Sequence, residues 1–262
     1  MGDLTESREM GIRFAVDIIR NSQRTVVLTG AGISTPSGIP DFRSPESGLW
    51  EKYDPFEVAS LTAFRYNPTR FYEWMRHLAT TILTAHPNPA HVSLARLQAL
   101  GYIHTIITQN IDALHQRAGA QQVLEVHGSI EHMSCIRCYK QFEAREFIGA
   151  YLADGEIPIC PDCFGVLKPD LVLMGEQLPV RVWLQAQDAS KNCDLMIVAG
   201  SSLEVLPVAG LPMRALENGA RLILINFTQT YLDVRADVVL HEDVAEVLPQ
   251  IVQHLVAGGA AF

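Results

Sequence analysis

The stretch TVVLTGAGIST, residues 25–35, decides the fold of this 262-residue chain. A short, β-branched apolar run that leads directly into glycines is typical of a buried parallel strand followed by a tight turn. Gly30 and Gly32, with Ala31 between them, would let backbone N–H groups approach a pyrophosphate at the start of a following helix. Because Thr35 stands where a dinucleotide fingerprint has its third glycine, a purely structural turn remains the alternative interpretation.

Further short apolar runs resemble the first one and alternate with helical patterns. These runs are residues 103–108, 123–126, 171–174, 195–199, 222–226 and 238–240. They are β-branched and do not alternate with polar residues, as expected for parallel strands covered on both faces. The helical patterns predict a helix over residues 3–21, one from Asn88-Pro89 to Gly101, and a last one opened by a capping box of Asp243 and Glu246. The sequence therefore predicts an α/β fold with a doubly wound, Rossmann-like parallel sheet.

Two stretches interrupt this alternation. One is rich in aromatic residues and proline and contains no clear strand, and the other carries most of the cysteines. We expect the large Rossmann-like domain to be discontinuous, comprising residues 1–44, 86–131 and 168–262. The smaller lobe would combine a helical insertion, residues 45–85, with a zinc-ribbon-like module, residues 132–167. A cleft is expected between the two lobes.

The composition excludes several classes of protein. Hydrophobic residues make up 48% and charged residues 19% of the chain, which is typical of a globular protein and excludes a disordered one. The net charge of −9 disfavours nucleic-acid binding and favours a cationic partner. No apolar run reaches the ~18 residues that span a bilayer, and the N-terminus lacks an apolar signal region. We therefore expect a cytoplasmic protein with neither a membrane nor a nucleic acid as its partner.

Four of the five cysteines form two Cys-x-x-Cys pairs, Cys135 with Cys138 and Cys160 with Cys163. This spacing is typical of a structural zinc site, in which four thiolates complete a tetrahedron and leave no position for a reactive water. A redox dithiol is the alternative, but it would need one pair beside a βαβ unit. The fifth cysteine, Cys193, is expected to be a small buried hydrophobe.

Polar residues follow the second and third predicted strands, at the sheet edge where ligands bind in open α/β folds. Gln109, Asn110 and Asp112 offer donors and acceptors for ribose hydroxyls and a carboxamide, and their alternative role is to cap a helix. His127 follows the third strand, and an imidazole with a usual pKa near 6.5 suits a general base. A structural role is the alternative for any single histidine.

Other loops add to the same cleft. Gly200-Ser201-Ser202 and Asn226 lie at the ends of two later strands. In the loop of residues 37–44, Phe42 can cover a flat ligand and Arg43 can pair with a phosphate in bidentate fashion. Together these positions predict one cleft for a nucleotide.

The combined motifs resemble those of a known family. GAGIS (30–34), GIPDFRS (38–44), TQNID (108–112), HG (127–128), the two cysteine pairs and GSSL (200–203) occur in the order found in sirtuins. From about residue 9 to residue 255, the chain closely resembles a sirtuin, an NAD-dependent protein-lysine deacylase. The resemblance implies NAD and Zn²⁺ as cofactors. It also implies transfer of an acetyl or other neutral acyl group from a protein lysine, with nicotinamide and O-acyl-ADP-ribose as products.

The resemblance assigns roles to individual residues. His127 is implied as the general base acting on a ribose hydroxyl of NAD, and Asn110 as the group that orients the ribose or a water. A nicotinamide pocket is implied at Ile39, Phe42, Ile111 and Asp112. The remaining contacts with NAD are implied for Gly30, Ala31, Gly32, Thr35, Asp41, Arg43, Gln109, Gly200, Ser201, Ser202, Asn226 and, near the adenine, Val244.

Substrate contacts are also implied by the resemblance. An extended peptide would be clamped by β-augmentation between residues 175–178 and 204–207. The implied substrate residues are Tyr72, Met75, Met174, Gly175, Glu176, Glu204 and Val205. The chain departs from the family where Met174 replaces a phenylalanine. It also has Met75 where sirtuins that prefer succinyl or malonyl lysine have an arginine, and Arg76 comes one residue late, about 100° further around a helix.

Two other functions are compatible with the same motifs. One is protein mono-ADP-ribosyl transfer or NAD hydrolysis, which would release ADP-ribose instead of acyl-ADP-ribose. The other is a non-catalytic NAD-sensing module, against which the presence of His127 and Asn110 argues. The expected partners are proteins with acylated lysines. Their identity and the oligomeric state stay open, with a monomer as one option.

Overall fold

Six parallel strands form the central sheet of the structure, a computed structural model that describes residues 2–41 and 53–258. The strands are β1 (Thr25–Thr29), β2 (Thr105–Thr108), β3 (Val123–Glu125), β7 (Leu195–Ala199), β8 (Arg221–Ile225) and β9 (Val238–Leu240). They lie in the order β3-β2-β1-β7-β8-β9, so that the winding reverses between β1 and β7. The predicted doubly wound sheet is confirmed, and ligands of such sheets bind beside this reversal.

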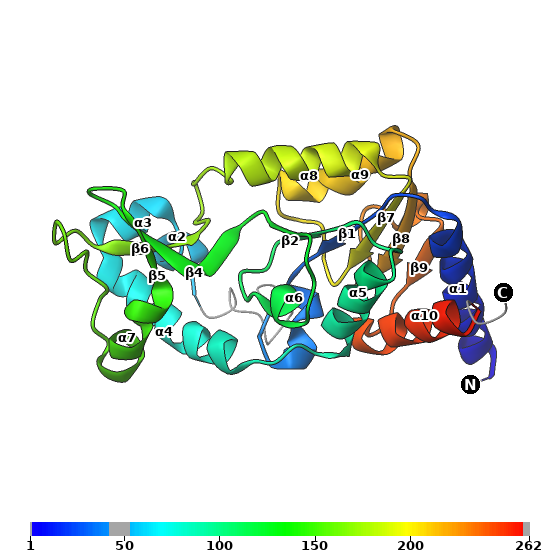
Figure 1. Ribbon diagram of the computed structural model, residues 1–262, viewed down its shortest axis with the longest axis horizontal. Helices are drawn as coiled ribbons and strands as arrows, with labels where there is room; N and C mark the ends of the chain where they lie inside the picture. Colours follow the sequence, from blue (N-terminus) through cyan, green and yellow to red (C-terminus); the bar gives the residue numbers. More distant parts are fainter. Residues whose placement is uncertain (1, 42–52, 259–262) are drawn as a thin grey trace.

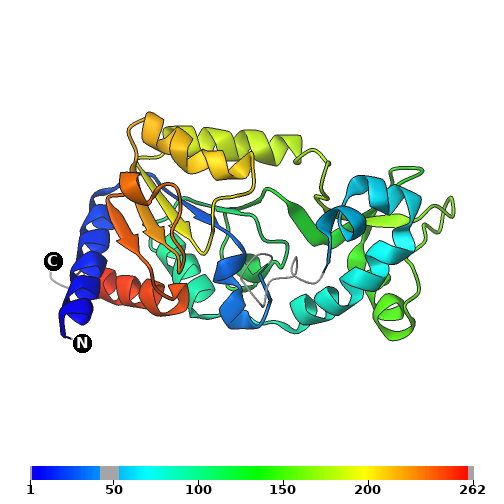
Figure 2. The ribbon, with the colours of Figure 1, turned by 180° about the vertical axis from the view of Figure 1, so that it is seen from behind.

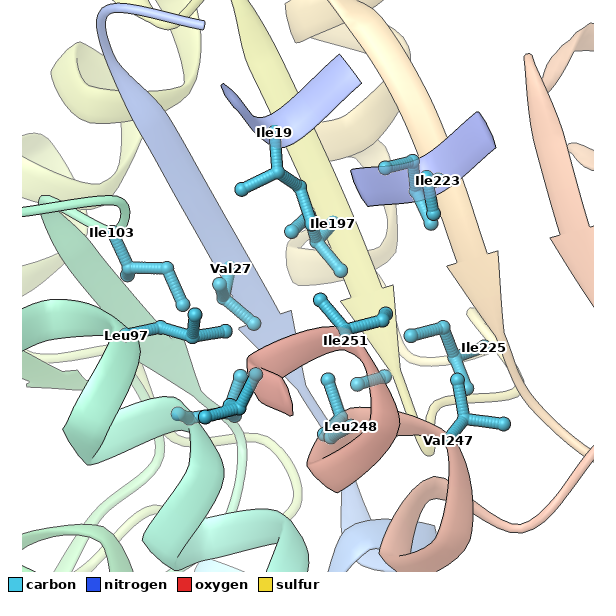
Figure 3. Close-up of a cluster of buried hydrophobic side chains, with 14 of the residues drawn as sticks. Ile19, Val27, Leu97, Ile103, Ile197, Ile223, Ile225, Val247, Leu248 and Ile251 are labelled. Carbon is cyan, nitrogen blue, oxygen red and sulfur yellow. The ribbon is translucent and has the colours of Figure 1, made fainter. Parts of the chain in front are cut away.

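Helices cover both faces of the sheet (Figures 1 and 2). On one face lie α1 (Gly2–Asn21), α5 (Pro89–Ala99) and α10 (Val244–Gly258), and on the other lie α8 (Val180–Asn192) and α9 (Leu211–Glu217). Successive side chains of a strand point to opposite faces. Val27 and Ile197 therefore join the core under α5 and α10, which Figure 3 shows, whereas Val26 and Val198 join the core under α8 and α9.

A smaller lobe lies at the end of the molecule away from the two termini (Figure 1). Between β1 and β2 the chain forms α2 (Pro55–Val58), α3 (Leu61–Tyr66) and α4 (Pro68–Thr84). After α6 (Leu114–Arg117) and β3, it forms β4 (Gly128–Cys135), β5 (Gln141–Glu143), α7 (Ile148–Asp154) and β6 (Leu167–Leu171). The strands make an antiparallel sheet, and side chains from both insertions share one hydrophobic cluster that includes Phe71, Tyr72, Met133 and Leu167.

Short 3-10 turns complete the described elements. They are η1 (Ala31–Ile33), η2 (Thr35–Ser37), η4 (Ala144–Glu146), η5 (Val208–Gly210) and η6 (Asp233–Arg235). The predicted helix directly after Gly32 is therefore wrong, because the chain makes two single turns there. None of the described helices combines the length and apolar character needed to cross a lipid bilayer.

One predicted strand belongs elsewhere. Residues 171–174 do not join the parallel sheet, since Leu171 ends β6 in the antiparallel sheet of the small lobe. The run is apolar because Leu171 and Leu173 are buried in the small-lobe core. A short apolar run does not by itself reveal which core it will join.

Both predicted N-cap residues cap their helices, but the capping box predicted for the last helix is not formed. Asn88 caps α5 as expected, with a reciprocal bond from His91. Asp243 also caps α10, accepting a hydrogen bond of 2.7 Å from the N–H of Ala245. The predicted box with Glu246 is not formed, because the carboxylate of Glu246 accepts a bond of 2.9 Å from Arg8 on α1.

The reversal of the sheet brings two glycine loops into direct contact. The N–H of Gly32 donates to the carbonyl of Gly200 over 2.9 Å. A Cβ on Gly30 or Gly32 would lie 2.9 Å from that carbonyl oxygen. Gly200 has a φ of +63°, and a Cβ there would lie 2.3 Å from the nitrogen of Ile33. These glycines therefore permit a close approach of backbone to backbone, and the approach of backbone to a pyrophosphate that the sequence suggested stays a prediction.

We predict that Gly200→Ala destabilises the protein far more than Gly219→Ala. Both glycines have positive φ, at +63° and +89°, so alanine is strained at both sites. Only at position 200 does the new Cβ also collide with backbone, and such a combination typically costs about 3 kcal/mol or more. Thermal unfolding should show a fall of about 10 °C for Gly200→Ala and of about 2–4 °C for the control. Equal shifts would contradict the contact.

Candidate functional site

A polar cavity of about 380 Å³ opens at the carboxyl ends of the central strands. Its volume lies within the range of small-molecule sites. The walls carry amide, hydroxyl and carboxylate groups, which suit ribose hydroxyls and a carboxamide. The lining residues are Gly30, Ala31, Gly32, Thr35, Asp41, Gln109, Asn110, His127, Gly200, Ser201, Ser202, Glu204, Val205, Asn226, Phe227, Thr228 and Gln229.

A second, larger cavity of about 750 Å³ lies beside the first. Its walls are mostly apolar and come from both lobes, with Trp74, Met75 and Leu78 contributed by α4. Residues 171–178 and 205–207 both line it, and they include most of the two segments predicted to clamp a peptide. Only Gln109, His127 and Val205 occur in the lining of both cavities. The two cavities therefore meet at His127.

His127 is held between the sheet and the small lobe. Its ring Nδ1 lies 3.1 Å from the carbonyl oxygen of Gln109, and because a carbonyl only accepts, Nδ1 carries the proton. That tautomer has its proton acceptor at Nε2. The carbonyl of His127 accepts a bond of 2.8 Å from the N–H of Val172. Gly128 follows with a φ of +76°, and a Cβ there would lie 2.0 Å from the carbonyl oxygen of Asp170.

Asn110 and Asp112 are tied to the glycine loop by buried hydrogen bonds. The Asn110 amide donates to the carbonyl of Gly30 over 3.1 Å and to the hydroxyl of Ser34 over 3.0 Å. The Asp112 carboxylate accepts from Ser34 over 2.6 Å and from the N–H of Leu114 over 2.9 Å. Burial raises the pKa of Asp112 above its ordinary value. Their side chains are thus fixed before any ligand binds.

Two buried histidines for which no role was predicted, His91 and His115, complete this network. His91 lies 3.5 Å from the Ser34 hydroxyl, and Nε2 of His115 lies 2.9 Å from the Thr29 hydroxyl. Burial lowers the pKa of His91 to about 4 and that of His115 to about 3, so both are neutral at physiological pH. A polar residue on the buried face of a helix, as at His91 in α5, was the available signal.

The predicted nicotinamide pocket corresponds to a small cavity of about 30 Å³ at the inner end of the site. Ile39, Ile111 and Asp112 line it together with Ala31, Ser34, Pro40, Leu78, Ile82 and Asn110. Phe42 and Arg43, the predicted ring and phosphate-binding cation, lie outside the described residues. The structure thus brings together the described part of this predicted pocket.

Other predicted NAD residues lie at the polar cavity, with one exception. The Gln109 amide donates to the Ser201 hydroxyl over 2.9 Å, and the Asn226 amide donates to the carbonyl of Thr228 over 2.8 Å. Val244 is 4% exposed, belongs to the core under α10 and does not line the cavity. The family resemblance implied a place near the adenine, but the side chain is buried in the core under α10.

The predicted acyl-lysine residues separate into two groups. Met75 is 3% exposed and lines the large cavity, as do Met174, Gly175 and Glu176. Tyr72 does not line it, because its hydroxyl donates to the carbonyl of Leu167 within the small-lobe core. Trp74, Leu78 and Trp183 also line the cavity, although no role was predicted for them; the aromatic content of residues 44–85 was the signal for Trp74.

Arg76 points away from the large cavity. Its guanidinium donates to the carbonyl of Leu152 over 3.1 Å from Nε and to that of Ala153 over 2.7 Å. No described residue that lines the large cavity is a lysine or an arginine. The chemistry of this cavity therefore suits a neutral ligand.

The four paired cysteines converge in the small lobe. Their sulfur atoms all lie within 4.8 Å of one another, with 3.4 Å between Cys135 and Cys163 and 3.7 Å between Cys138 and Cys160. Four sulfurs at ~2.3 Å from one zinc ion would be about 3.8 Å apart. The donor set therefore fits Zn²⁺. Cys193 is buried separately, as expected, and its thiol donates to the carbonyl of Ser190.

Comparisons with known proteins agree with these features. Residues 30–207 match the Sir2 family. The chain is 45% identical to NAD-dependent protein deacylase 2 of Archaeoglobus fulgidus, over 93% of this chain and 96% of that protein. It is 41% identical to an NAD-dependent protein deacetylase of Thermotoga maritima, over 93% and 98% of the two chains. A Sir2 structure with a p53 peptide and NAD⁺ is 38% identical, covers 95% of this chain and 99% of its own, and has a TM-score of 0.86.

We predict that Cys160→Ala abolishes zinc binding and unfolds the small lobe, with indirect loss of activity. Freshly purified protein should contain one zinc ion per chain by mass-spectrometric metal analysis. Cys193→Ala is the matched control, because Cys193 lies outside the cluster, and it should retain the metal. Unmodified protein without zinc would contradict the assignment.

Proposed function

This chain belongs to the Sir2 family and is an NAD-dependent protein-lysine deacetylase, and we propose that its activity resides where the two cavities meet at His127. The reaction yields nicotinamide, free lysine and O-acyl-ADP-ribose. One observation carries the proposal: a polar cavity that suits a nucleotide and an apolar cavity that suits an acylated lysine share a single imidazole. The geometry favours deacylation, since NAD hydrolysis or NAD sensing would not require the apolar cavity.

The polar cavity fits NAD through the chemistry of its donor set. Amides of Gln109, Asn110 and Asn226 and hydroxyls of Ser201 and Ser202 suit the two riboses and the adenine side. Asp112 and Ile111, with Ile39, would hold the nicotinamide end at the small inner cavity. NAD supplies the ADP-ribose group that takes up the acyl group, with release of nicotinamide. Ala31, Thr35, Asp41 and the glycines that line the cavity would surround the phosphates.

His127 is assigned to proton transfer. The bond from Nδ1–H to the Gln109 carbonyl leaves Nε2 as the proton acceptor, at the boundary of both cavities. An imidazole placed there can take the proton of a ribose hydroxyl as that oxygen attacks the acyl carbon. Asn110, fixed by Gly30 and Ser34, would orient the ribose or a water. The buried network limits reorganisation during the reaction, as electrostatic catalysis requires.

The large cavity is assigned to the acylated lysine and its peptide. Residues 175–178 and 205–207 both line it, which supports a peptide held as an added strand, and Glu204 lines the neighbouring polar cavity. Met75 and Met174 supply flexible apolar surface around the acyl group. The predicted cytoplasmic location, the absence of nucleic-acid and membrane partners, and the domain boundaries stay predictions.

We predict that His127→Ala lowers deacetylation by ~100-fold or more, which is typical of the loss of a general base. NAD binding and thermal stability should change little, because the imidazole lies at a cavity surface. His104→Ala, a change at an exposed histidine, is the control and should keep full activity. The measurement is nicotinamide release from an acetyl-lysine peptide. Near-normal turnover by His127→Ala would refute the assignment of the base.

We predict a preference for neutral acyl groups. A succinyl carboxylate would be buried without a cation, which costs several kcal/mol, so kcat/KM for an acetyl peptide should exceed that for a matched succinyl peptide by about tenfold or more. Met75→Arg should raise succinyl activity and lower acetyl activity. Arg76→Ala is the control and should leave the ratio of the two kcat/KM values unchanged, since Arg76 binds backbone carbonyls in the last turn of α7. Equal or better succinyl turnover by the unmodified protein would refute this preference.

A further inference from the structure

A single irregular stretch, residues 171–178, forms much of the wall of the large cavity. Strand β6 ends at its first residue, so regular strand pairing does not hold the rest. Its backbone is tied at two places. The N–H of Val172 donates to the carbonyl of His127 over 2.8 Å, and Met174 exchanges bonds of 2.9 and 3.0 Å with Ala59 and Leu61 of the small lobe. The turn between Leu173 and Glu176 is closed by one backbone bond and, in addition, by side chains.

The ammonium group of Lys168 contacts this stretch near both of its ends. The residue is 9% exposed. Its Nζ donates to the carbonyls of Pro169 over 2.8 Å and Leu171 over 2.9 Å, and lies 3.2 Å from Oε2 of Glu176. Two of the three ammonium protons thus have backbone acceptors, and Glu176 supplies the opposite charge. Because the group is buried, it requires the charge of Glu176.

Glu176 closes the turn from the other end. Its Oε2 also accepts a hydrogen bond of 3.0 Å from the N–H of Leu173, three residues earlier. The N–H of Glu176 donates to the carbonyl of Leu173 over 2.9 Å. Both backbone groups of Leu173 are thus bonded to Glu176. Met174 and Gly175, the two residues between them in sequence, line the cavity. Charge-assisted bonds of this kind are stronger than neutral ones.

We propose that Lys168 and Glu176 are positioning residues for the acylated peptide. Their ion pair sets the shape of residues 171–178 and thereby the affinity for the peptide, without affecting the affinity for NAD. The inference rests on the proposed function, because it assigns the large cavity to the peptide. It changes the interpretation of Glu176, whose carboxylate serves the turn instead of the substrate. Neither residue lines the polar cavity, so the NAD side should not depend on the pair.

Kinetics and direct binding together test the proposal. Lys168→Met keeps the apolar stem and removes the charge, and it should raise KM for an acetyl-lysine peptide by about tenfold or more. KM for NAD and kcat should stay within about twofold, a split that general loss of folding would not produce. Lys168→Arg should restore most of the affinity, because it retains the charge and several donors. Lys191→Met, at an exposed lysine of α8, is the matched control and should leave all constants unchanged.

Glu176→Gln provides a second variant should Lys168→Met fail to fold, since glutamine keeps an oxygen for the N–H of Leu173. It should weaken peptide binding, and in the double variant the two effects should not add. Dissociation constants for a fluorescent acetyl-lysine peptide, measured by anisotropy without NAD, separate binding from chemistry. Unchanged peptide affinity in Glu176→Gln, or equal losses for peptide and NAD, would overturn the proposal. Unmodified protein that neither binds the peptide nor releases nicotinamide would instead overturn the proposed function.

Discussion

The close contact between the loops that follow β1 and β7 is the constraint on which the site depends. Gly32 donates to Gly200 across the reversal of the sheet, at a separation of 2.9 Å that no Cβ would permit. The contact sets the course of the chain through Gly30 to Ser34, whose carbonyl and hydroxyl groups receive the Asn110 amide. Two strands that are far apart in sequence therefore determine where the Asn110 amide points.

Burial then gives these contacts their strength. Ser34, Asn110, Asp112, His91 and His115 are all buried polar residues of one network, and leaving any of them without a partner would cost about 1–3 kcal/mol. The lowered pKa values of the two histidines mean that the network carries no imidazolium at neutral pH. Burial raises the pKa of Asp112, while its hydrogen bonds with Ser34 and Leu114 and the charge of Arg117 act in the opposite direction. The site is thus rigid on the nucleotide side for reasons internal to the large lobe.

The sequence predicted the features that depend on local pattern and missed those that depend on packing. β1, β7 and β9 have the predicted bounds, since an apolar β-branched run between polar residues specifies a covered strand. Residues 171–174 have the same pattern but belong to the small lobe, because a local pattern does not identify which core receives it. Gly30 and Gly32 were likewise found, but their contact with Gly200 was not, since Gly200 is distant in sequence. His115 and Trp74 were missed because only tertiary structure places them beside the site.

Residues 171–178 connect the two lobes at the site. His127 lies at the end of the sheet, and its carbonyl receives the N–H of Val172, while two residues later Met174 bonds to the helical insertion. A peptide bound along residues 171–178 would therefore contact a stretch that is attached both to His127 and to the small lobe. Zinc held by the four cysteines would organise that lobe, and with no open coordination position it would contribute to catalysis through geometry alone. In the proposed function, acyl recognition, peptide binding and the placement of His127 would all depend on the shape of this one irregular segment, which regular strand pairing does not hold and which therefore needs an internal ion pair.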